Sequence, residues 1–348
     1  MIYAKELNQI LKPKINPDLP VVVDLFAGAG GLSLGFEAVG FKTIGYEMHS
    51  TYCDTYNNNL QGECIELELN QDSDIVESDI IIGSPPCQPF SEVGKGKGLK
   101  DARDGFPAFI SIIKRNRPLI WMFENVPGMI HDKNIGYLIE IREALEKDYR
   151  IYPVLDRSKK INCADYGVPQ SRKRIFMIGY RKGIYKFPRK TTPVQKLHVT
   201  AGEALGDLLE NTNHEYEYLS EKQEAYIKSY EIKCELKTPR DLHMNSPSRT
   251  LTTRNVSGAT ADMLRIKLED GRRRMLTHHE AARLQSFPDW FKFSGNRSQI
   301  STQIGNAVPP LLAYHIGQSF KTYFSTLEPE IQATTYQSRL ELPDLSTT

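Results

Sequence analysis

Short runs of consecutive apolar residues alternate with stretches of helically spaced apolar residues, from about residue 21 to about residue 180. Such runs are typical of strands buried on both faces of a parallel sheet, and the stretches between them are typical of the connecting helices. The pattern predicts an α/β fold with one open, mostly parallel, Rossmann-like sheet. We expect its strands at residues 21–25, 42–46, 63–67, 79–82, 119–123, 150–155 and 175–179.

The alternation stops near residue 181, where proline and threonine clusters, polar stretches and two basic sequences follow. The basic sequences lie at residues 246–254 and 272–274. We expect a sheet domain at residues 1–183, completed by residues 300–325, and a smaller, irregular domain at residues 184–299.

The end of the chain is predicted to hold one more helix, opened by residues 303–310 and ending near residue 320. Residues 326–348 show no apolar periodicity, and we expect them to be disordered.

Composition narrows the class of protein. The 348 residues are 40% hydrophobic and 25% charged, with a net charge of +1, so any nucleic-acid surface must come from local clustering. The five cysteines form no CxxC pair, which argues against a disulfide framework and against a metal site. The first residues are polar, and no run approaches the ~18 apolar residues of a membrane span. We expect a cytoplasmic protein with no membrane contact and no metal.

The sequence Gly-Ser-Pro-Pro-Cys-Gln-Pro-Phe-Ser at residues 83–91 follows directly on a predicted strand. Ligands bind at the carboxyl ends of strands in open α/β sheets. Pro85 and Pro86 fix their own φ angles and favour extended backbone before them, which restrains Cys87. A lone cysteine is more often a small buried hydrophobe. A thiol held at this sheet edge is nevertheless suited to nucleophilic attack.

A glycine-rich turn follows the first predicted strand. Gly28 and Gly30 allow a sharp turn close to a ligand, and the helix after them offers free N–H groups to an anion. Ser33 occupies the last glycine position of a GxGxxG fingerprint, so the turn fails as a dinucleotide site. Glu47 ends the second predicted strand, where a carboxylate can bind a ribose diol. The pair fits an adenosine ligand without a phosphate.

Charged residues mark two further strands. Glu124 ends the strand at residues 119–123 and shares a sheet edge with Cys87, although a strand-end acid alone is commonly a surface residue. Arg172 and Arg174 alternate as they enter the strand at residues 175–179, so we expect them to point to the same site. Two arginines are costly to bury unless they bind an acceptor.

Taken together, these blocks resemble the cytosine-5 DNA methyltransferases of bacterial restriction–modification systems. The similarity covers most of the chain in family order, with DLFAGAGGLSLGF at residues 24–36, GSPPCQPFS at 83–91, ENVPGM at 124–129, QSRKRIFMIG at 170–179, EAARLQSFPDWF at 280–291 and QIGNAVPP at 303–310. The combination of the Pro-Cys-Gln, Glu-Asn-Val and Gln-x-Arg-x-Arg blocks is highly specific.

The resemblance implies a reaction and its catalytic residues. Cys87 is implied as the nucleophile that adds to carbon 6 of a flipped-out cytosine and makes carbon 5 reactive. Glu124 is implied to hold or protonate ring nitrogen 3. Arg174, with Arg172 in support, is implied to hold the ring carbonyl oxygen and to orient Glu124.

The resemblance also implies S-adenosyl-methionine as cofactor. Departures from the family pattern are Glu66 where an aspartate is usual, Met48 where the residue is often aromatic, and His279 where an arginine is usual. The implied cofactor-binding residues are Phe26, Gly28, Ala29, Gly31, Glu47, Met48, Glu66, Leu67, Gly83, Pro86, Asn306 and Ala307.

The implied partner is double-stranded DNA, with residues 184–299 as the target-recognition domain and its hinge. Glycines and lysines at residues 94–100 suit a mobile lid that brings positive charge to phosphates. We expect a bacterial monomer whose cognate restriction endonuclease acts on the same site without needing to bind the protein. The expected DNA-binding residues are Gln88, Ser91, Lys95, Lys97 and Arg254, the last in a loop after a strand at residues 249–253 and placed to read a guanine edge.

Three alternatives remain at the level of sequence. A transfer-RNA cytosine-5 methyltransferase would use the same blocks, but such enzymes carry a Cys-Phe-Thr element that this chain lacks. A dinucleotide oxidoreductase is opposed by Ser33 and would leave Cys87, Glu124 and Arg174 unexplained. An inactive DNA-binding relative is opposed by the intact catalytic set.

Overall fold

The computed structural model describes residues 2–86, 104–152, 160–209, 216–235, 240–258 and 262–340. An eight-stranded sheet organises the molecule, with strand order β3-β2-β1-β4-β5-β9-β6 and with β7 paired to β9. This confirms the predicted α/β class. The strands are β1 (Val22–Leu25), β2 (Thr43–Glu47), β3 (Glu63–Glu66), β4 (Ile80–Gly83), β5 (Ile120–Asn125), β6 (Arg150–Tyr152), β7 (Ile161–Asn162) and β9 (Lys173–Tyr180).

The sheet changes direction at one edge. Strands β1 to β5 run parallel, whereas β9 is antiparallel to both β5 and β6. Strand β1 lies between β2 and β4, so the chain winds one way from β1 to β3 and then crosses to the other side for β4 and β5. Such a reversal opens a crevice at the carboxyl ends of the central strands, here β1 and β4.

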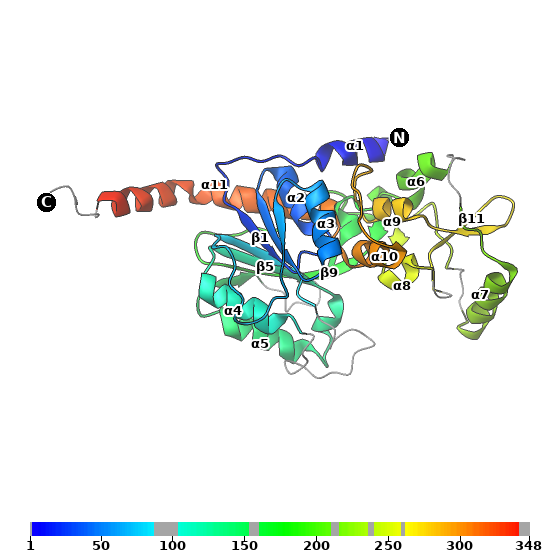
Figure 1. Cartoon of the computed structure of the whole chain (residues 1–348), viewed down its shortest axis with the longest axis horizontal. Helices are drawn as coiled ribbons and strands as arrows, with labels where there is room; N and C mark the ends of the chain where they lie inside the picture. The colour runs from blue at the N-terminus through cyan, green and yellow to red at the C-terminus, as the bar shows by residue number, and fades with distance from the viewer. Residues whose placement is uncertain are drawn as a thin grey trace.

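Helices cover both faces of the sheet (Figure 1). Alternate residues of each strand enter separate cores, as the pleat requires. Ile80 and Ile82 pack with α2 and α11 on one face, and Ile81 packs with α4 and α5 on the other. The helices that frame the sheet are α1 (Ile2–Ile10), α2 (Gly31–Val39), α3 (Ser50–Asn59), α4 (Phe106–Asn116), α5 (Ile135–Leu145) and α11 (Pro310–Leu340).

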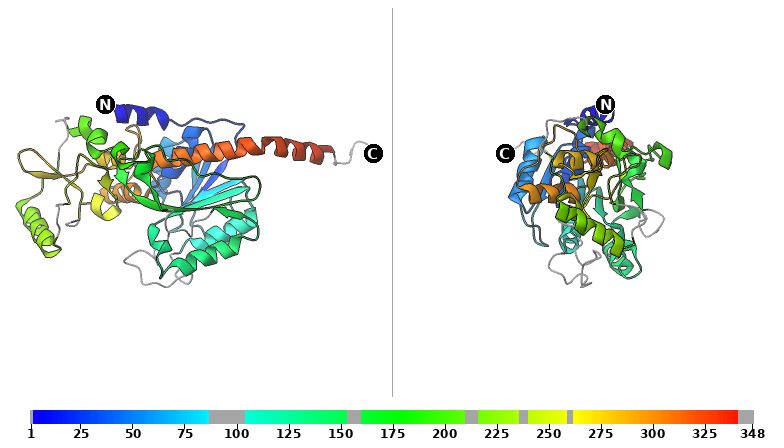
Figure 2. Two further views of the ribbon diagram at one scale, coloured as in Figure 1. Left: turned by 180° about the vertical axis from the view of Figure 1, so that it is seen from behind. Right: turned by 90° about the vertical axis from the view of Figure 1, so that its right-hand side faces the viewer.

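The residues between β9 and α11 form short elements, which lie at the end of the molecule opposite to the carboxyl end of α11 (Figures 1 and 2). A third core joins them to α2 and α3, because Leu34 and Tyr56 pack in the same cluster as Leu251 and Leu284. This shared core fixes the irregular region against the sheet. Its elements are α6 (Ala201–Leu209), α7 (Glu221–Lys233), β10 (Ser248–Arg249), α8 (Thr253–Val256), β11 (Arg265–Lys267), β12 (Arg273–Met275), α9 (His278–Leu284) and α10 (Arg297–Asn306), and β10 pairs with β8 (Gln170–Ser171).

The strand expected at residues 249–253 is wrong. Strand β10 ends at Arg249, and helix α8 begins at Thr253, so Arg254 lies on a helix. The β-branched threonines favoured a strand, but Thr252 and Asn255 form a reciprocal capping box that starts the helix.

The end of the chain also differs from the expectation. Gln303 lies in a separate helix, α10, that ends at Asn306, because Pro309 and Pro310 cannot continue a helix and favour extended backbone before them. Helix α11 then runs to Leu340, well past residue 320, so residues 326–340 are helical where disorder was expected. Extending a packed helix needs no new nucleation, and this explains the continuation.

No helix within the described residues is long and apolar enough to cross a membrane.

Candidate active site

Pro86 and Asp104 flank a stretch that lies outside the described residues. The backbone on each side of this stretch is held at the same edge of the sheet. The Asn125 side chain donates from Nδ2 to the Pro85 carbonyl at 2.9 Å. The Gly105 amide donates to the Pro86 carbonyl at 3.2 Å. The backbone at Pro85 and Pro86 therefore lies beside the carboxyl end of β5. Cys87, Gln88, Ser91, Lys95 and Lys97 lie outside the described residues.

Glu124 and Arg174 form an ion pair at this edge. Arg174 Nε lies 2.7 Å from Glu124 Oε1, and the two side chains are only 7% and 11% exposed, respectively, for Glu124 and Arg174. Antiparallel pairing of β5 with β9 sets this contact, because Glu124 lies opposite Phe176, two residues after Arg174. The carboxylate is thus held with a fixed orientation in a partly desolvated place, where charge interactions are strong.

Arg172 does not join this pair, contrary to the expectation that both arginines point to one site. Its guanidinium is buried and donates from its terminal nitrogens to the carbonyls of Leu251, at 2.7 Å, and Gly305, at 3.0 Å. The strand period does not apply, because Arg172 lies between β8 and β9 and its amide turns back to Gln170. Arg172 therefore joins the sheet to α10 and to the segment before α8.

Most of the described cysteines are poorly suited to act as a nucleophile. Cys53, Cys64 and Cys163 are buried. Burial raises the pKa of the Cys163 thiol to about 12 and outweighs the opposite effect of Arg172 and Arg174. A buried, protonated thiol is inert. Cys234, at the end of α7, is the one exposed cysteine among the described residues.

The glycine-rich turn after β1 has the backbone that a close ligand contact requires. Phe26 and Gly28 adopt positive φ angles of 60° and 55°. A Cβ atom built on Gly28 would meet no atom within 4 Å, so open space lies beside the turn. A non-glycine residue at positive φ, such as Phe26, is a strained conformation that is common at functional sites.

The Glu47 side chain holds this turn in place through hydrogen bonds. Its carboxylate accepts from the Gly28 amide at 3.0 Å, from the His49 amide at 3.0 Å and from His49 Nδ1 at 2.8 Å. The side chain is buried, and Oε2, which accepts only from Gly28, keeps a further lone pair for a ligand hydroxyl. These features fit an adenosine ligand: a buried acid, open space at Gly28, and the exposed side chain of Met48 beside them.

The other expected cofactor residues follow the same sheet edge. Glu66 ends β3 directly opposite Glu47, and its side chain is exposed. The Leu67 amide donates to the Glu47 carbonyl at 2.9 Å. Gly83 ends β4 so close to β1 that a Cβ atom there would lie 2.7 Å from the Leu25 carbonyl. Four adjacent parallel strands, β3, β2, β1 and β4, thus bring these distant residues to one line.

Asn306 and Ala307 reach this line from the far end of the chain. A Cβ atom on Gly31 would lie 3.4 Å from the Ala307 Cβ and 2.7 Å from the Val308 carbonyl. The start of α2, where Ala29 is buried, therefore touches the link between α10 and α11. The Asn306 side chain is exposed and accepts from Thr253 Oγ1 at 3.5 Å.

The basic run Arg272–Arg274 is neutralised within the protein. Arg272 pairs with Asp270 and lies over the Tyr218 ring. Arg273 pairs with Glu224 and Asp241, and buried Arg274 pairs with Glu280 at 2.6 Å. These arginines therefore do not form the free basic loop that the sequence suggested. Arg254, by contrast, is exposed on α8.

His279, which stands where the family pattern has an arginine, makes a local contact. Its Nε2 lies 3.0 Å from Asp289 Oδ1, an oxygen that also accepts from Arg283 Nε at 2.8 Å. The buried Arg283 side chain also forms an ion pair with Asp207 on α6, at 2.5 Å. The histidine thus contributes to the packing of α9 against the following loop.

Sequence reasoning missed two positions that shape the site. Asn125 was seen only as part of a block, although its amide holds the backbone at Pro85. Asp24 is buried on β1 and accepts from Ser33 Oγ at 2.7 Å. An acid inside an apolar strand run is a readable signal of such a contact, since a buried polar group requires a partner.

Comparison with known proteins agrees with this geometry. The family model of C-5 cytosine-specific DNA methylases matches residues 21–322. The chain is 48% identical to Type II methyltransferase M.AplI of Arthrospira platensis, over 92% of this chain and 91% of that protein. It is 30% identical to Type II methyltransferase M.FnuDI of Fusobacterium nucleatum, over 86% and 94% of the two chains.

Solved structures share the fold. DNMT2 of Spodoptera frugiperda superposes with a TM-score of 0.64 at 18% identity, over 86% of this chain and 98% of that one. Dnmt2 of S. pombe gives a TM-score of 0.60 at 18% identity, over 89% and 99%.

The fold and the edge on which these residues gather are those of a DNA-modifying methyltransferase. The chain belongs to the C-5 cytosine-specific DNA methylase family, and its relatives place it among the Type II restriction–modification enzymes. It is a DNA cytosine-5 methyltransferase, and membership of this family implies S-adenosyl-methionine as methyl donor.

Proposed function

We propose that this enzyme methylates a cytosine flipped out of a specific short site in duplex DNA, through a covalent bond between the Cys87 sulfur and carbon 6. The observation that carries the proposal is the Glu124–Arg174 pair, which lies beside the backbone from which Cys87 emerges. Addition of the thiolate to carbon 6 turns the ring into an enamine and makes carbon 5 nucleophilic. Once the methyl group is transferred, a base removes the carbon 5 proton and the thiolate leaves.

Glu124 and Arg174 would stabilise the developing charge on the ring. Glu124 holds or protonates nitrogen 3 as electrons move into the ring, and Arg174 binds the ring carbonyl oxygen. Their mutual contact at 2.7 Å supports this division, because it orients the carboxylate before the substrate arrives. Arg172 forms no hydrogen bond or ion pair with either of them in the described structure, and we assign it the support of α10 and of the segment before α8.

The cofactor residues would act by positioning. S-adenosyl-methionine supplies an electrophilic methyl group on a sulfonium. Glu47 would bind the ribose hydroxyls, and Met48 and Leu67 would contact the adenine beside Glu66. The open space at Gly28 supports this placement, because it is a cradle that a side chain would fill. Contacts to the rest of the molecule are proposed for Phe26, Ala29, Gly31, Gly83, Pro86, Asn306 and Ala307.

Access to carbon 6 requires that the base leave the stack, at a cost of about a few kcal/mol. Gln88 and Ser91 would contact the opened duplex, and Lys95 and Lys97 would bind phosphates and help to offset this cost. We assign target recognition to residues 184–299, with Arg254 as a reader of base edges. We further propose that the enzyme acts as a monomer and protects a site that a cognate endonuclease cuts.

Transfer of labelled methyl groups from S-adenosyl-methionine tests this proposal. Unmethylated bacteriophage DNA and transfer RNA are offered in parallel, and the labelled base is identified by chromatography. We expect 5-methylcytosine in DNA alone, at one short sequence that bisulfite sequencing then defines. Label in transfer RNA alone would support the transfer-RNA alternative, and label in neither would support an inactive DNA-binding relative.

A further inference from the structure

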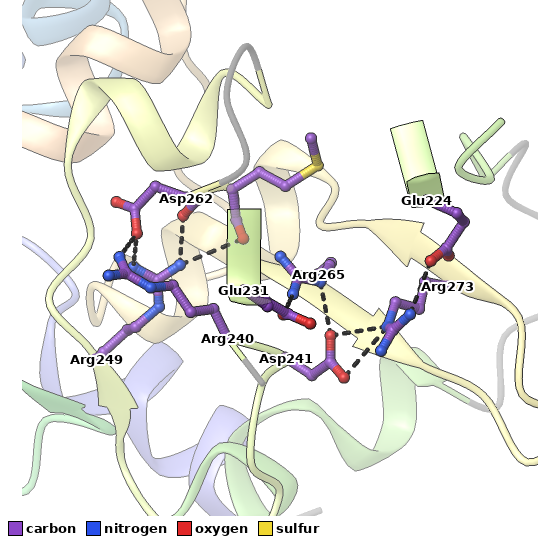
Figure 3. Close-up of polar contacts among 9 residues, drawn as sticks. Glu224, Glu231, Arg240, Asp241, Arg249, Asp262, Arg265 and Arg273 are labelled. Carbon is purple, nitrogen blue, oxygen red and sulfur yellow. Dashed lines mark hydrogen bonds and ion pairs between the residues drawn. The ribbon is translucent and has the colours of Figure 1, made fainter. Parts of the chain in front are cut away.

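Four arginines and four carboxylates form a network of two separate parts in the small domain (Figure 3). Its larger part ties α7 to the β11–β12 hairpin: buried Arg265 contacts Glu231 and lies 2.6 Å from Asp241, and Arg273 lies 2.7 Å from Glu224. Equal numbers of positive and negative groups leave this network without net charge. It therefore has the character of an internal brace.

The smaller part of the network centres on Asp262, whose carboxylate binds both Arg240 and Arg249. Arg249 reaches it at 3.1 Å and also donates to the carbonyls of Asp262 and Met263. Arg249 ends β10, directly before the segment that forms α8, and the Leu264 amide donates back to the Asn255 carbonyl at 3.0 Å. These contacts close the base of the segment that carries α8.

The other side of α8 is fixed to the catalytic body. The Leu251 amide donates to Gln170 Oε1 at 2.8 Å, and the Leu251 carbonyl accepts from Arg172 at 2.7 Å. The backbone at Thr253 lies against Gly305 of α10, where a side chain would not fit. Helix α8 is thus held from one side by the sheet and α10, and from the other by the Asp262 contacts.

Arg254 is the exception among the seven arginines from residue 240 to residue 274. Within the described structure, its guanidinium has no ion pair or hydrogen bond, whereas the other six bind carboxylates. Its side chain is exposed on α8, next to Thr253, which contacts Asn306. The segment presents one unneutralised arginine near the line of cofactor residues.

We propose that Asp262 is a positioning residue for sequence discrimination: by binding Arg240 and Arg249 together, it fixes the segment from which Arg254 reads a base pair. This inference rests on the proposed function. A guanidinium can make two hydrogen bonds to O6 and N7 of guanine only if its approach is fixed, so a segment free to tilt loses discrimination before it loses affinity.

The charges around Arg249 explain why the carboxylate is needed. Burial, then the nearby charges of Arg240 and Arg265, lower the pKa of Arg249 to about 10. Without Asp262, Arg240 and Arg249 would face each other as like charges with part of their shells desolvated. The base of the segment would then open, while the larger part of the network, around Asp241, would remain.

Replacement of Asp262 by asparagine tests the proposal. Methylation of the preferred site is compared with methylation of sites that differ from it by one base pair. The ratio that matters is kcat/KM for the preferred site divided by kcat/KM for a site changed at the base pair that Arg254 reads. We expect this ratio to fall at least about fivefold, which is the low end of the contribution of a good bidentate contact. The matched control is Glu224→Gln, which removes a carboxylate from the other part of the network and is expected to leave the ratio unchanged.

A double-mutant cycle with Arg254→Ala separates positioning from general destabilisation. Asp262→Asn should add no further loss of discrimination when Arg254 is already alanine, whereas two independent effects would multiply. If Asp262→Asn has a lower melting temperature than Glu224→Gln, the same comparison is repeated with Asp262→Glu, which keeps the negative charge. A site preference equal to that of the control, in a folded variant, overturns the inference. Absence of DNA methylation by the unmodified protein would instead overturn the proposed function.

Discussion

Arg174 Nε lies 2.7 Å from Glu124 Oε1, across two strands that run in opposite directions. The contact joins the carboxyl end of a parallel strand, where ligands bind, to the start of an antiparallel one. The Glu124 carboxylate, to which we assign a catalytic role, is thereby oriented by a residue fifty positions away in the chain.

Arg174→Ala should lower the rate of methyl transfer about 10²- to 10³-fold, because it removes a preorganised charge from the ring and releases Glu124. Single-turnover measurements with bound DNA isolate this step. The neighbouring, exposed Lys173 provides the control, and Lys173→Ala should leave the rate unchanged. Equal rates for the two variants would contradict the role given to Arg174.

Gly28→Ala should weaken binding of S-adenosyl-methionine by about tenfold or more, since the new methyl group would enter the space beside the turn. Titration calorimetry measures the affinity. Gly271 is a matched control, because it too has a positive φ and open space around its Cβ position, but lies in the β11–β12 turn. Gly271→Ala carries the same backbone strain and should bind normally. Similar losses in both variants would show that strain alone is responsible.

Asp24 should make stability depend on pH. Burial raises the pKa of Asp24 to about 7, against the hydrogen bonds from Ser33 that lower it. The folded protein therefore keeps a proton that the unfolded chain releases above about pH 4. Between these values the free energy of unfolding should fall as pH rises, by at most about 1.4 kcal/mol per pH unit.

Asp24→Asn should remove this dependence, because the amide oxygen still accepts from Ser33 and carries no charge. Urea unfolding from about pH 5 to about pH 8 measures it. The difference in free energy of unfolding between the variant and the unmodified protein should grow in favour of the variant up to about pH 7. Above that pH it should stay constant. A difference that does not vary with pH would contradict the buried, protonated carboxyl.

Replacing Lys95 and Lys97 together by alanine should flatten the salt dependence of DNA binding. Removing one lysine–phosphate contact lowers the slope of log affinity against log salt by about 0.9, so removing both should lower it by up to about 1.8. Filter binding over a range of salt concentrations gives the slope. Lys5 and Lys12, exposed near α1, are the control pair. An unchanged slope in the Lys95 and Lys97 variant would contradict their binding to phosphate.

Sequence reasoning located the sheet edge well, because strand ends can be read from apolar runs and parallel strands bring their ends together. Glu47 illustrates this, because the strand that precedes it was enough to place it at this edge. Glu66, which the family resemblance implied, lies directly opposite it. Arg172 shows the limit. The direction of its side chain depends on a break between β8 and β9 that the apolar pattern does not reveal.

Ion pairing in the small domain was equally hidden. The run Arg272–Arg274 reads as a basic surface, but its partners Glu224, Asp241 and Glu280 come from other elements. Only the fold shows which positive charges are neutralised within the protein. Local signals can also conflict, as at Thr252, where strand propensity and a capping box predict different structures.

The most direct test of the covalent mechanism uses duplex DNA with 5-fluorocytosine at the target position. Fluorine on carbon 5 cannot be removed as a proton is, so the reaction should stop after methyl transfer, with the bond between Cys87 and carbon 6 still intact. A complex stable to denaturing electrophoresis should form with the unmodified protein and with Cys234→Ala, which lacks the exposed cysteine of α7. It should be absent with Cys87→Ala. A stable complex with Cys87→Ala, or a DNA adduct mapped by mass spectrometry to another residue, would contradict the account.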